Sequence, residues 1–191
     1  MSDILLTPPV NAQDHVAGPD DAPVTLVEYG DFECPYCGMA YPIVKKIQRE
    51  LGNQLRFVYR HFPLAEAHPH ARIAAQAAEA AGAQGKFWEM HDTLFENQQA
   101  LDVEDLIGYA KALGLDTTRF ARDLEAGTYA KRVRDDFRSG VRSGVNGTPS
   151  FFVNGARYDG SWANEKAFIH ALQEAAQQSG RGTPTTADAN G

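Results

Sequence analysis

The stretch that decides the fold is Val24-Thr-Leu-Val-Glu-Tyr-Gly-Asp-Phe-Glu-Cys-Pro-Tyr-Cys37. Its first six residues are rich in β-branched and apolar side chains, which predicts a strand over about Val24–Tyr29. A glycine and an aspartate end this strand, and a helix opens at Cys34. Pro35 suits the first helical position, because its missing N–H has no partner to lose there and its φ is already helical. The two cysteines therefore share the first helical turn and can face each other.

The spacing of Cys34 and Cys37 indicates redox chemistry. A helix N-terminus offers unpaired N–H groups and about half a positive charge, which favour a thiolate, the form that attacks disulfides. Cys34 is then the nucleophile, and Cys37 resolves the mixed disulfide. Such a pair at a strand-to-helix junction predicts a thioredoxin-like redox motif. The alternative is a zinc knuckle, which needs two more ligands, and the candidates are histidines such as His68 and His70.

Three motifs together resemble those of DsbA-like thiol:disulfide oxidoreductases of the thioredoxin superfamily. Glu28, six residues before Cys34, matches the position of that superfamily's buried acid. Pro42, eight residues after Cys34, matches a proline that kinks the first helix. Far along the chain, Gly147-Thr-Pro-Ser-Phe-Phe-Val-Asn-Gly155 resembles the loop that carries a cis-proline. The resemblance covers about residues 14–178, with the motifs in the expected order.

The resemblance implies a role for each residue of the site. Glu28 is expected to be a buried acid that moves protons to and from Cys37, although the strand pattern alone also allows a surface glutamate. Pro149 is expected to be cis and to stand across from Cys34, leaving backbone for an extended substrate segment; an ordinary trans proline is the alternative. The implied catalytic residues are Cys34, Cys37 and Glu28, and the implied substrate contacts are Pro35, Tyr36, Thr148 and Pro149.

Two residues beside the cysteines bear on the reduction potential. Tyr36 occupies a position where the strongly oxidising periplasmic enzymes have histidine, and Pro-Tyr is the pair seen in glutaredoxins. Glu33 places a negative charge directly before Cys34, which opposes the helix dipole. We therefore expect a Cys34 pKa of roughly 5.5 to 7. The potential is then expected to lie between those of thioredoxin and DsbA, at roughly -250 to -150 mV.

The pattern after the first helix is helical rather than alternating. Apolar spacing predicts helices over Ala71–Ala81, Lys86–Phe95 and 102–113, a short one around residues 120–124, and a long one over Tyr129–Val141. With a predicted strand before this block and a hairpin after it, the resemblance implies an α/β, thioredoxin-like fold. In that fold a central mixed sheet is flanked by helices, and an all-helical subdomain is inserted.

The predicted domain organisation follows from these elements. Residues 14–62 and 128–178 form the thioredoxin-like domain, and residues 63–127 form the inserted helical subdomain. Residues 1–13 are expected to be a flexible tail, and residues 179–191 a disordered one.

Composition narrows the function classes. The net charge of -7 argues against nucleic-acid binding, and no run is apolar and long enough to span a membrane. No cofactor or metal motif is present. The chain has 2 cysteines, both in the motif, and the N-terminus lacks a basic, then apolar, leader. We therefore expect a cytoplasmic protein, or a periplasmic one if a leader was removed. Histidines are expected on the surface or in the core.

The sequence thus predicts a dithiol-disulfide oxidoreductase acting on protein thiols and disulfides, recycled by an unidentified redox partner, as a monomer or weak dimer. Two alternatives stay open. One is a glutathione-dependent transferase or isomerase on a related fold, although those relatives use a single serine or cysteine. The other is a non-catalytic redox sensor or adaptor whose cysteine pair switches a binding surface.

Overall fold

The computed structural model describes residues 4–180 of the 191-residue chain. Its strands and helices fall, with few exceptions, where the sequence pattern predicts them. In chain order they are β1 His15–Ala17, β2 Val24–Gly30, α1 Pro35–Leu51, the short η1 Gly52–Gln54, β3 Leu55–His61, α2 Ala71–Gly82, α3 Phe87–Glu96, α4 Val103–Ala112, α5 Thr117–Glu125, α6 Ala130–Arg142, β4 Ser150–Val153, β5 Ala156–Arg157 and α7 Glu165–Gly180. Helix α1 continues through Pro42 without a break.

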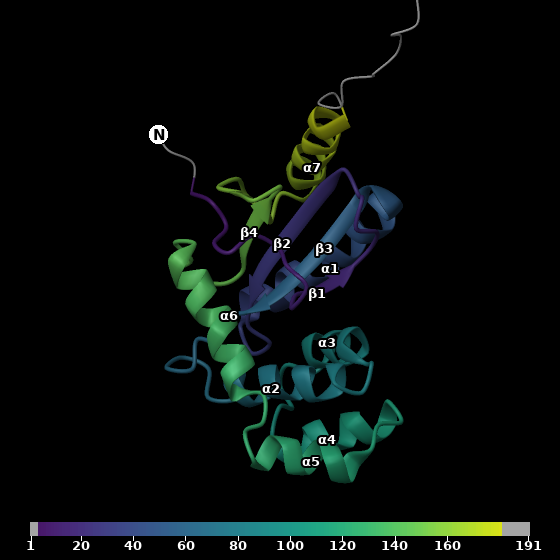
Figure 1. Cartoon of the computed structure of the whole chain (residues 1–191), viewed down its shortest axis with the longest axis vertical. Helices are drawn as coiled ribbons and strands as arrows, with labels where there is room; N and C mark the ends of the chain where they lie inside the picture. The colour runs from purple at the N-terminus through teal and green to yellow at the C-terminus, as the bar shows by residue number, and fades with distance from the viewer. Residues whose placement is uncertain (1–3, 181–191) are drawn as a thin grey trace, which may run out of the picture.

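A single mixed sheet organises the chain, with strand order β1-β3-β2-β4-β5 (Figure 1). Strands β2 and β3 are parallel and joined through α1, whereas β1, β4 and β5 run antiparallel to their neighbours. Parallel strands need a crossover connection, and α1 supplies it. The predicted thioredoxin-like fold, a mixed sheet flanked by helices with a helical insertion, is confirmed.

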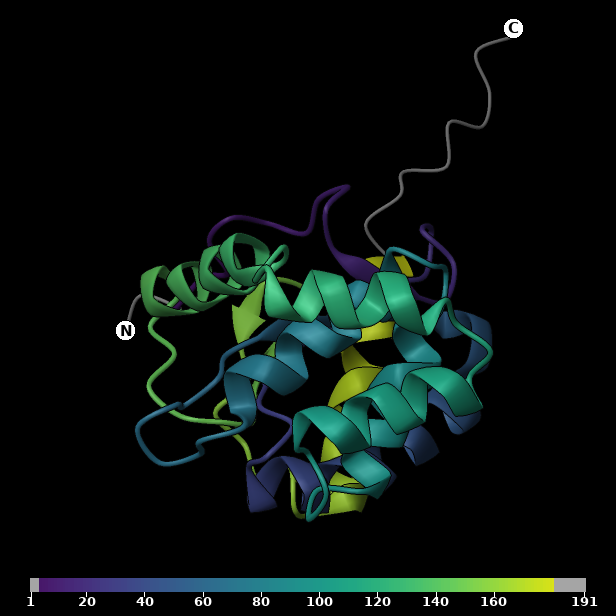
Figure 2. The same ribbon diagram turned by 90° about the horizontal axis from the view of Figure 1, so that it is seen from below.

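The two faces of the sheet bury different side chains, because successive residues of a strand point to opposite sides. On one face, Leu26 and Phe57 pack with the apolar sides of α1 and α7. On the other, Val27 and Val58 pack with Phe137 of α6. Figures 1 and 2 show α6 and α1 on opposite sides of the sheet.

The inserted helices α2–α5 lie below the sheet in Figure 1 and face the viewer in Figure 2. They share one continuous apolar core with the sheet, which runs through the alanines of α2 to Met90, Leu106 and Phe120. Small alanine side chains let α2 approach α3 and α5 closely. The helical insertion therefore enlarges the core of the whole molecule rather than building a separate one.

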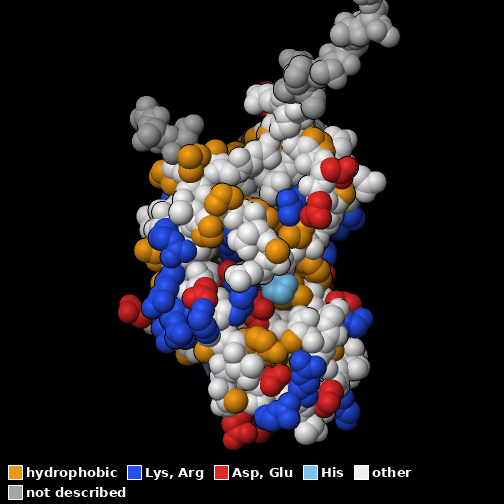
Figure 3. Space-filling view, viewed as in Figure 1, with side chains coloured by type: hydrophobic (Ala, Val, Ile, Leu, Met, Phe, Trp, Pro, Cys, Tyr) orange, Lys and Arg blue, Asp and Glu red, His pale blue; other side chains and the backbone are white. Residues whose placement is uncertain are grey.

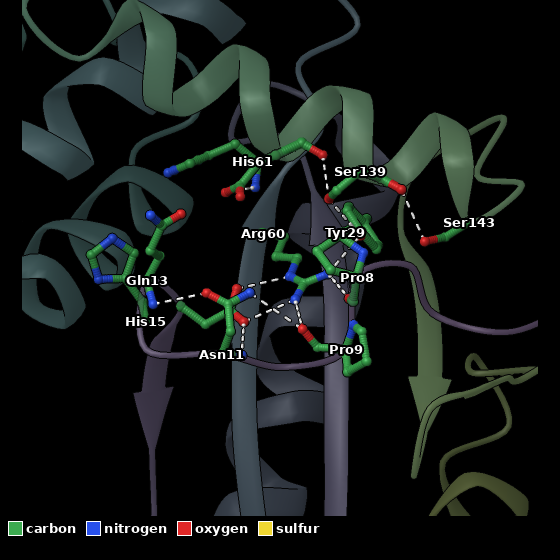
Figure 4. A network of polar contacts seen from close by, with 12 residues as sticks. Pro8, Pro9, Asn11, Gln13, His15, Tyr29, Arg60, His61, Ser139 and Ser143 are labelled. Carbon is green, nitrogen blue, oxygen red and sulfur yellow. Dashed lines mark hydrogen bonds and ion pairs between the residues drawn. The ribbon is translucent and has the colours of Figure 1, made fainter.

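The N-terminal segment differs from the flexible tail that the sequence predicts. From residue 4 onward it lies along the sheet, where the Leu6 N–H donates to the Gly155 carbonyl at 2.8 Å. The buried guanidinium of Arg60 donates to both carboxylate oxygens of Asp14 at 2.8 Å and to the carbonyls of Pro8 and Pro9 (Figure 4). A buried arginine needs this many acceptors, and the segment provides them. Residues 1–3 and 181–191 lie outside the described residues.

The surface carries its basic side chains unevenly. Arg134, Arg138 and Arg142 follow one another at i, i+4 and i+8 along α6 and are exposed. Figure 3 shows lysine and arginine side chains gathered on this side of the molecule. Between residues 4 and 180, no helix has both the length and the apolar composition to cross a membrane.

Candidate active site

Both cysteines are free thiols at the start of α1, where β2 ends. Cys34 is the N-cap residue and Pro35 the first helical residue, as predicted. The chain reverses between strand and helix through the hydrogen bond from the Cys34 N–H to the Asp31 carbonyl, at 3.1 Å. Cys37 is completely buried, and Cys34 is 3% exposed.

The two sulfurs differ sharply in acidity. A hydrogen bond from the Cys37 thiol lowers the pKa of Cys34 to about 5; the N–H groups of Tyr36 and Cys37 assist, and burial opposes the shift. Burial raises the pKa of Cys37 well above its usual range, and the hydrogen bond to Cys34 and the negative charge of Glu28 add to this. At neutral pH, Cys34 is therefore the thiolate and Cys37 the thiol. A nucleophilic cysteine needs to be a thiolate, and a resolving cysteine stays protonated until the mixed disulfide has formed.

Glu28 lies on β2 behind the cysteines and is 2% exposed. Burial raises its pKa to about 8, and the negative charge of Cys34 contributes. Among the described residues, its Oε1 has no hydrogen-bond partner. A carboxyl group in this state gains and loses a proton near neutral pH, which suits proton transfer.

The loop before β4 closes the other side of the site. The Thr148–Pro149 peptide bond is cis. The Cys34 sulfur lies 3.5 Å from the Thr148 carbonyl oxygen, to which its thiol form donates, so this loop contacts the nucleophile. On the helix side, Tyr36 is 62% and Met39 58% exposed, which gives the site an apolar rim. Met39 was not among the residues predicted from the sequence, because it lies after both cysteines in the helix and belongs to none of the recognised motifs.

Two acidic residues of the active-site loop bind histidines from the segment before α2. The buried Asp31 carboxylate contacts His68 Nδ1 at 2.8 Å, and against the opposing effect of burial it raises the pKa of His68. The Glu33 carboxylate contacts His70 Nδ1 at 2.8 Å and accepts from its backbone N–H at 2.6 Å. The hydrogen bond to Glu33 raises the pKa of His70.

This pairing corrects the expectation about Glu33. The raised pKa of His70 favours its charged form, and that positive charge offsets the negative charge of Glu33 beside the thiolate. The Cys34 pKa of about 5 lies below the predicted range, and the largest cause of its shift is the hydrogen bond from the Cys37 thiol. The sequence offered one signal, the acid pair around Phe32 and the histidine pair around Pro69, but nothing local showed that the two segments meet.

A second contact that sequence reasoning missed comes from the helical insertion. The Gln98 side-chain amide donates to the carbonyls of Phe32 and Cys34, both at 2.9 Å. A Cβ atom at Gly38 would lie 2.1 Å from Gln98 Oε1, so glycine provides the room for this approach. Gln98 thereby fixes the backbone on both sides of the active-site turn.

The alternative zinc site is not assembled. Nδ1 of His68 and of His70 each contacts a carboxylate, and the two cysteines form no metal-sized cluster with them in residues 4–180. The group in that range whose ligand atoms lie within 4.8 Å of one another is His61, Glu79 and Asp136, all buried. Arg132 forms an ion pair with Asp136 and lies 3.9 Å from Glu79. A guanidinium thus already balances these carboxylates.

Solved structures share this architecture. BdbD from Bacillus subtilis superposes with a TM-score of 0.82 at 25% identity, over 92% of this chain and 100% of BdbD. A thioredoxin-like oxidoreductase from Silicibacter pomeroyi has a TM-score of 0.75 at 30% identity, over 91% and 95% of the two chains. Wolbachia pipientis α-DsbA1, 18% identical, shares the fold with a TM-score of 0.79 over 93% and 98% of the two chains.

Curated relatives match at higher identity but over part of their length. A protein from Salinispora arenicola named Na⁺/H⁺ antiporter NhaA 1 is 50% identical over 171 residues, which is 90% of this chain and 26% of that protein. The chain thus spans about a quarter of the curated relatives it matches. The family described as Thioredoxin matches residues 10–173. The chain therefore belongs to the thioredoxin family.

Proposed function

We propose that this protein is a thiol:disulfide oxidoreductase that exchanges disulfides with protein substrates. The Cys34 thiolate attacks one sulfur of a substrate disulfide; the Cys34–substrate disulfide forms, and the other substrate sulfur leaves as a thiolate. Glu28 then takes the proton of Cys37, and the Cys37 thiolate attacks Cys34. The second substrate thiolate departs, so two electrons have reduced the substrate and oxidised the cysteine pair. Oxidation of a substrate dithiol is the same sequence reversed.

The observation that carries this proposal is the difference between the two thiols. One cysteine at the helix start has its pKa lowered to about 5, and its partner one turn later is buried with a raised pKa. A structural pair would need no such asymmetry. The apolar rim of Tyr36 and Met39 and the cis Thr148–Pro149 loop leave an edge on which an extended substrate segment could lie.

The acidity of Cys34 also bears on direction. Its pKa of about 5 lies between the values of roughly 7 for thioredoxin and 3.5 for DsbA. A more stable thiolate favours the reduced protein and makes the couple more oxidising. We therefore propose a potential between about -270 mV and about -120 mV. Equilibration with glutathione buffers of known ratio measures it.

Trapping tests the assignment of the two cysteines. Cys34→Ser should abolish exchange with insulin, whereas Cys37→Ser should still attack and accumulate mixed disulfides with its partners. The reason is that only Cys34 has a thiolate at neutral pH. Non-reducing mass spectrometry of the adducts identifies the bonded cysteine. Mixed disulfides that form through Cys37 in the Cys34→Ser protein would reverse the assignment.

A second candidate function is favoured by the curated relatives. Because sequences 44–50% identical to this chain occur in proteins named as Na⁺/H⁺ antiporters, the cysteine pair could serve as a redox switch that reports to a transporter rather than as a turnover enzyme. The insulin assay separates the two, since a switch changes oxidation state without multiple turnovers. A cytoplasmic location and a monomer or weak dimer remain predictions from the sequence.

A further inference from the structure

A buried tyrosine lies beside the acid of the site. Tyr59 of β3 is the register partner of Glu28 on the adjacent parallel strand β2, so the two side chains emerge on the same face of the sheet. Tyr59 is 0% and Glu28 2% exposed. Among the described residues, neither the Tyr59 hydroxyl nor Glu28 Oε1 has a hydrogen-bond partner. Two buried polar atoms without partners are costly, and one water enclosed between them would satisfy both.

The packing around Tyr59 aims its hydroxyl at the active-site turn. The ring stacks on Phe32 with centroids 5.2 Å apart, which fixes its plane. A Cβ atom at Gly30 would lie 2.7 Å from the hydroxyl oxygen, so the oxygen reaches the end of β2 next to the cysteines. Burial raises the pKa of Tyr59 well above its usual range, and negative charge on Cys37 and then on Glu28 adds to the rise. The hydroxyl therefore lies at the end of β2, and both groups that exchange the proton act on it electrostatically.

We propose that Tyr59 is a positioning residue for proton transfer between Cys37 and Glu28, its hydroxyl holding the Glu28 carboxylate through one enclosed water that bonds both. This inference rests on the proposed function. It assigns the hydroxyl to the resolving step alone, because Cys34 obtains its charge from the helix start and from Cys37.

The direction of the effect follows from which form of Glu28 the hydroxyl favours. A tyrosine hydroxyl donates to a carboxylate more strongly than to a carboxylic acid, so it holds the Glu28 pKa down against burial. Without the hydroxyl, this pKa rises further above neutrality. A smaller fraction of Glu28 is then ionised at pH 7, and Cys37 loses its proton more slowly.

Other titratable groups around the ring must be considered in any pH profile. Those that face Tyr59 from the neighbouring elements are Cys37 of α1, Asp31 of the active-site loop, His61 of β3, His91 of α3 and Asp136 of α6. Burial lowers the pKa of His91, which therefore stays neutral near pH 7. None of these groups is altered when only the Tyr59 hydroxyl is removed, so a comparison with phenylalanine isolates that hydroxyl.

The test uses the chromogenic disulfide dithiobis-nitrobenzoate, which resolves the two steps in one trace. Attack by Cys34 releases a first nitrothiobenzoate, and attack by Cys37 on the mixed disulfide releases a second. Tyr59→Phe should leave the first rate within about twofold and slow the second about tenfold at pH 7, the range of one hydrogen bond to a charged group. The pH midpoint of the second step should move upward by about one unit.

Two further variants make the result specific. Tyr29→Phe removes another buried hydroxyl from the sheet, on the opposite face, where it bonds Ser139 and Arg60; it should keep both release rates. In a Glu28→Gln background, Tyr59→Phe should add no further slowing. If the wild-type protein releases two equivalents of nitrothiobenzoate and Tyr59→Phe releases the second at the same rate and with the same pH midpoint, the role of Tyr59 is overturned and the proposed function stands. If the wild-type protein never releases the second equivalent of nitrothiobenzoate, the proposed function is overturned, and this inference with it.

Discussion

Replacing Glu28 by Gln should make the reduced protein more stable, and increasingly so as pH rises. Glu28 is enclosed on β2 and its pKa is raised by burial to about 8, from an ordinary value of 4.5. The folded protein therefore holds a proton that the unfolded chain releases above pH 4.5. The contribution of the protonated Glu28 to the free energy of unfolding is fully present below that pH and is lost as pH rises toward 8. Glutamine has the same shape and carries no charge to bury.

The size of the effect follows from the width of this pH window. Each pH unit between 4.5 and 8 costs the wild-type protein about 1.4 kcal/mol. The gain from Glu28→Gln should therefore be below about 1 kcal/mol at pH 5 and about 3 kcal/mol at pH 7. At pH 8 it should be about 4 kcal/mol, a large share of the stability of a domain of this size.

Urea unfolding of the reduced proteins at several pH values between 5 and 8 measures the difference directly. The same pair should also be compared in a Cys34→Ser background, because the Cys34 thiolate is the second cause of the raised Glu28 pKa. Most of the gain should survive there, since burial is the larger cause. A difference that stays constant from pH 5 to pH 8 would refute the reasoning, because Glu28 would then titrate as an exposed carboxyl does.

Two more substitutions test contacts that only the structure revealed. Glu33→Gln should move the Cys34 pKa by less than about half a unit, because His70, whose pKa is raised, is hydrogen-bonded to this carboxylate and offsets its charge. Titration of the thiolate absorbance checks this, and a fall of a full unit would contradict it. Asp14→Asn should cost about 3 kcal/mol in urea unfolding, because it leaves the buried Arg60 guanidinium without its counter-charge. Asp20→Asn, at an ion-paired carboxylate that is 89% exposed, should cost less than about 0.5 kcal/mol, and equal losses would show that Arg60 is not tied down as described.

The elements of the fold could be read from local pattern. Alternating apolar residues gave the two central strands, Pro35 and the glycine breaks gave the helix limits, and the alanine-rich run gave α2. The part of the site that could be predicted is the part formed by residues close together in the sequence. Cys34 and Cys37 lie one turn apart at a helix start, where the Cys37 thiol and the first N–H groups of the helix acidify Cys34, so the nucleophile needs no tertiary information.

What tertiary structure alone decided are the contacts between segments far apart in sequence. Glu33 meets His70 across 37 positions, and Arg60 binds Asp14 across 46, which is why the predicted tail is instead fixed to the sheet. In the sequence, Tyr59 is one more apolar strand residue; only the parallel register with β2 places its side chain on the same face of the sheet as that of Glu28. Such pairings depend on which strands and loops become neighbours in the folded protein. The residues next to a charged group or hydroxyl in the sequence do not indicate which distant residue it will contact.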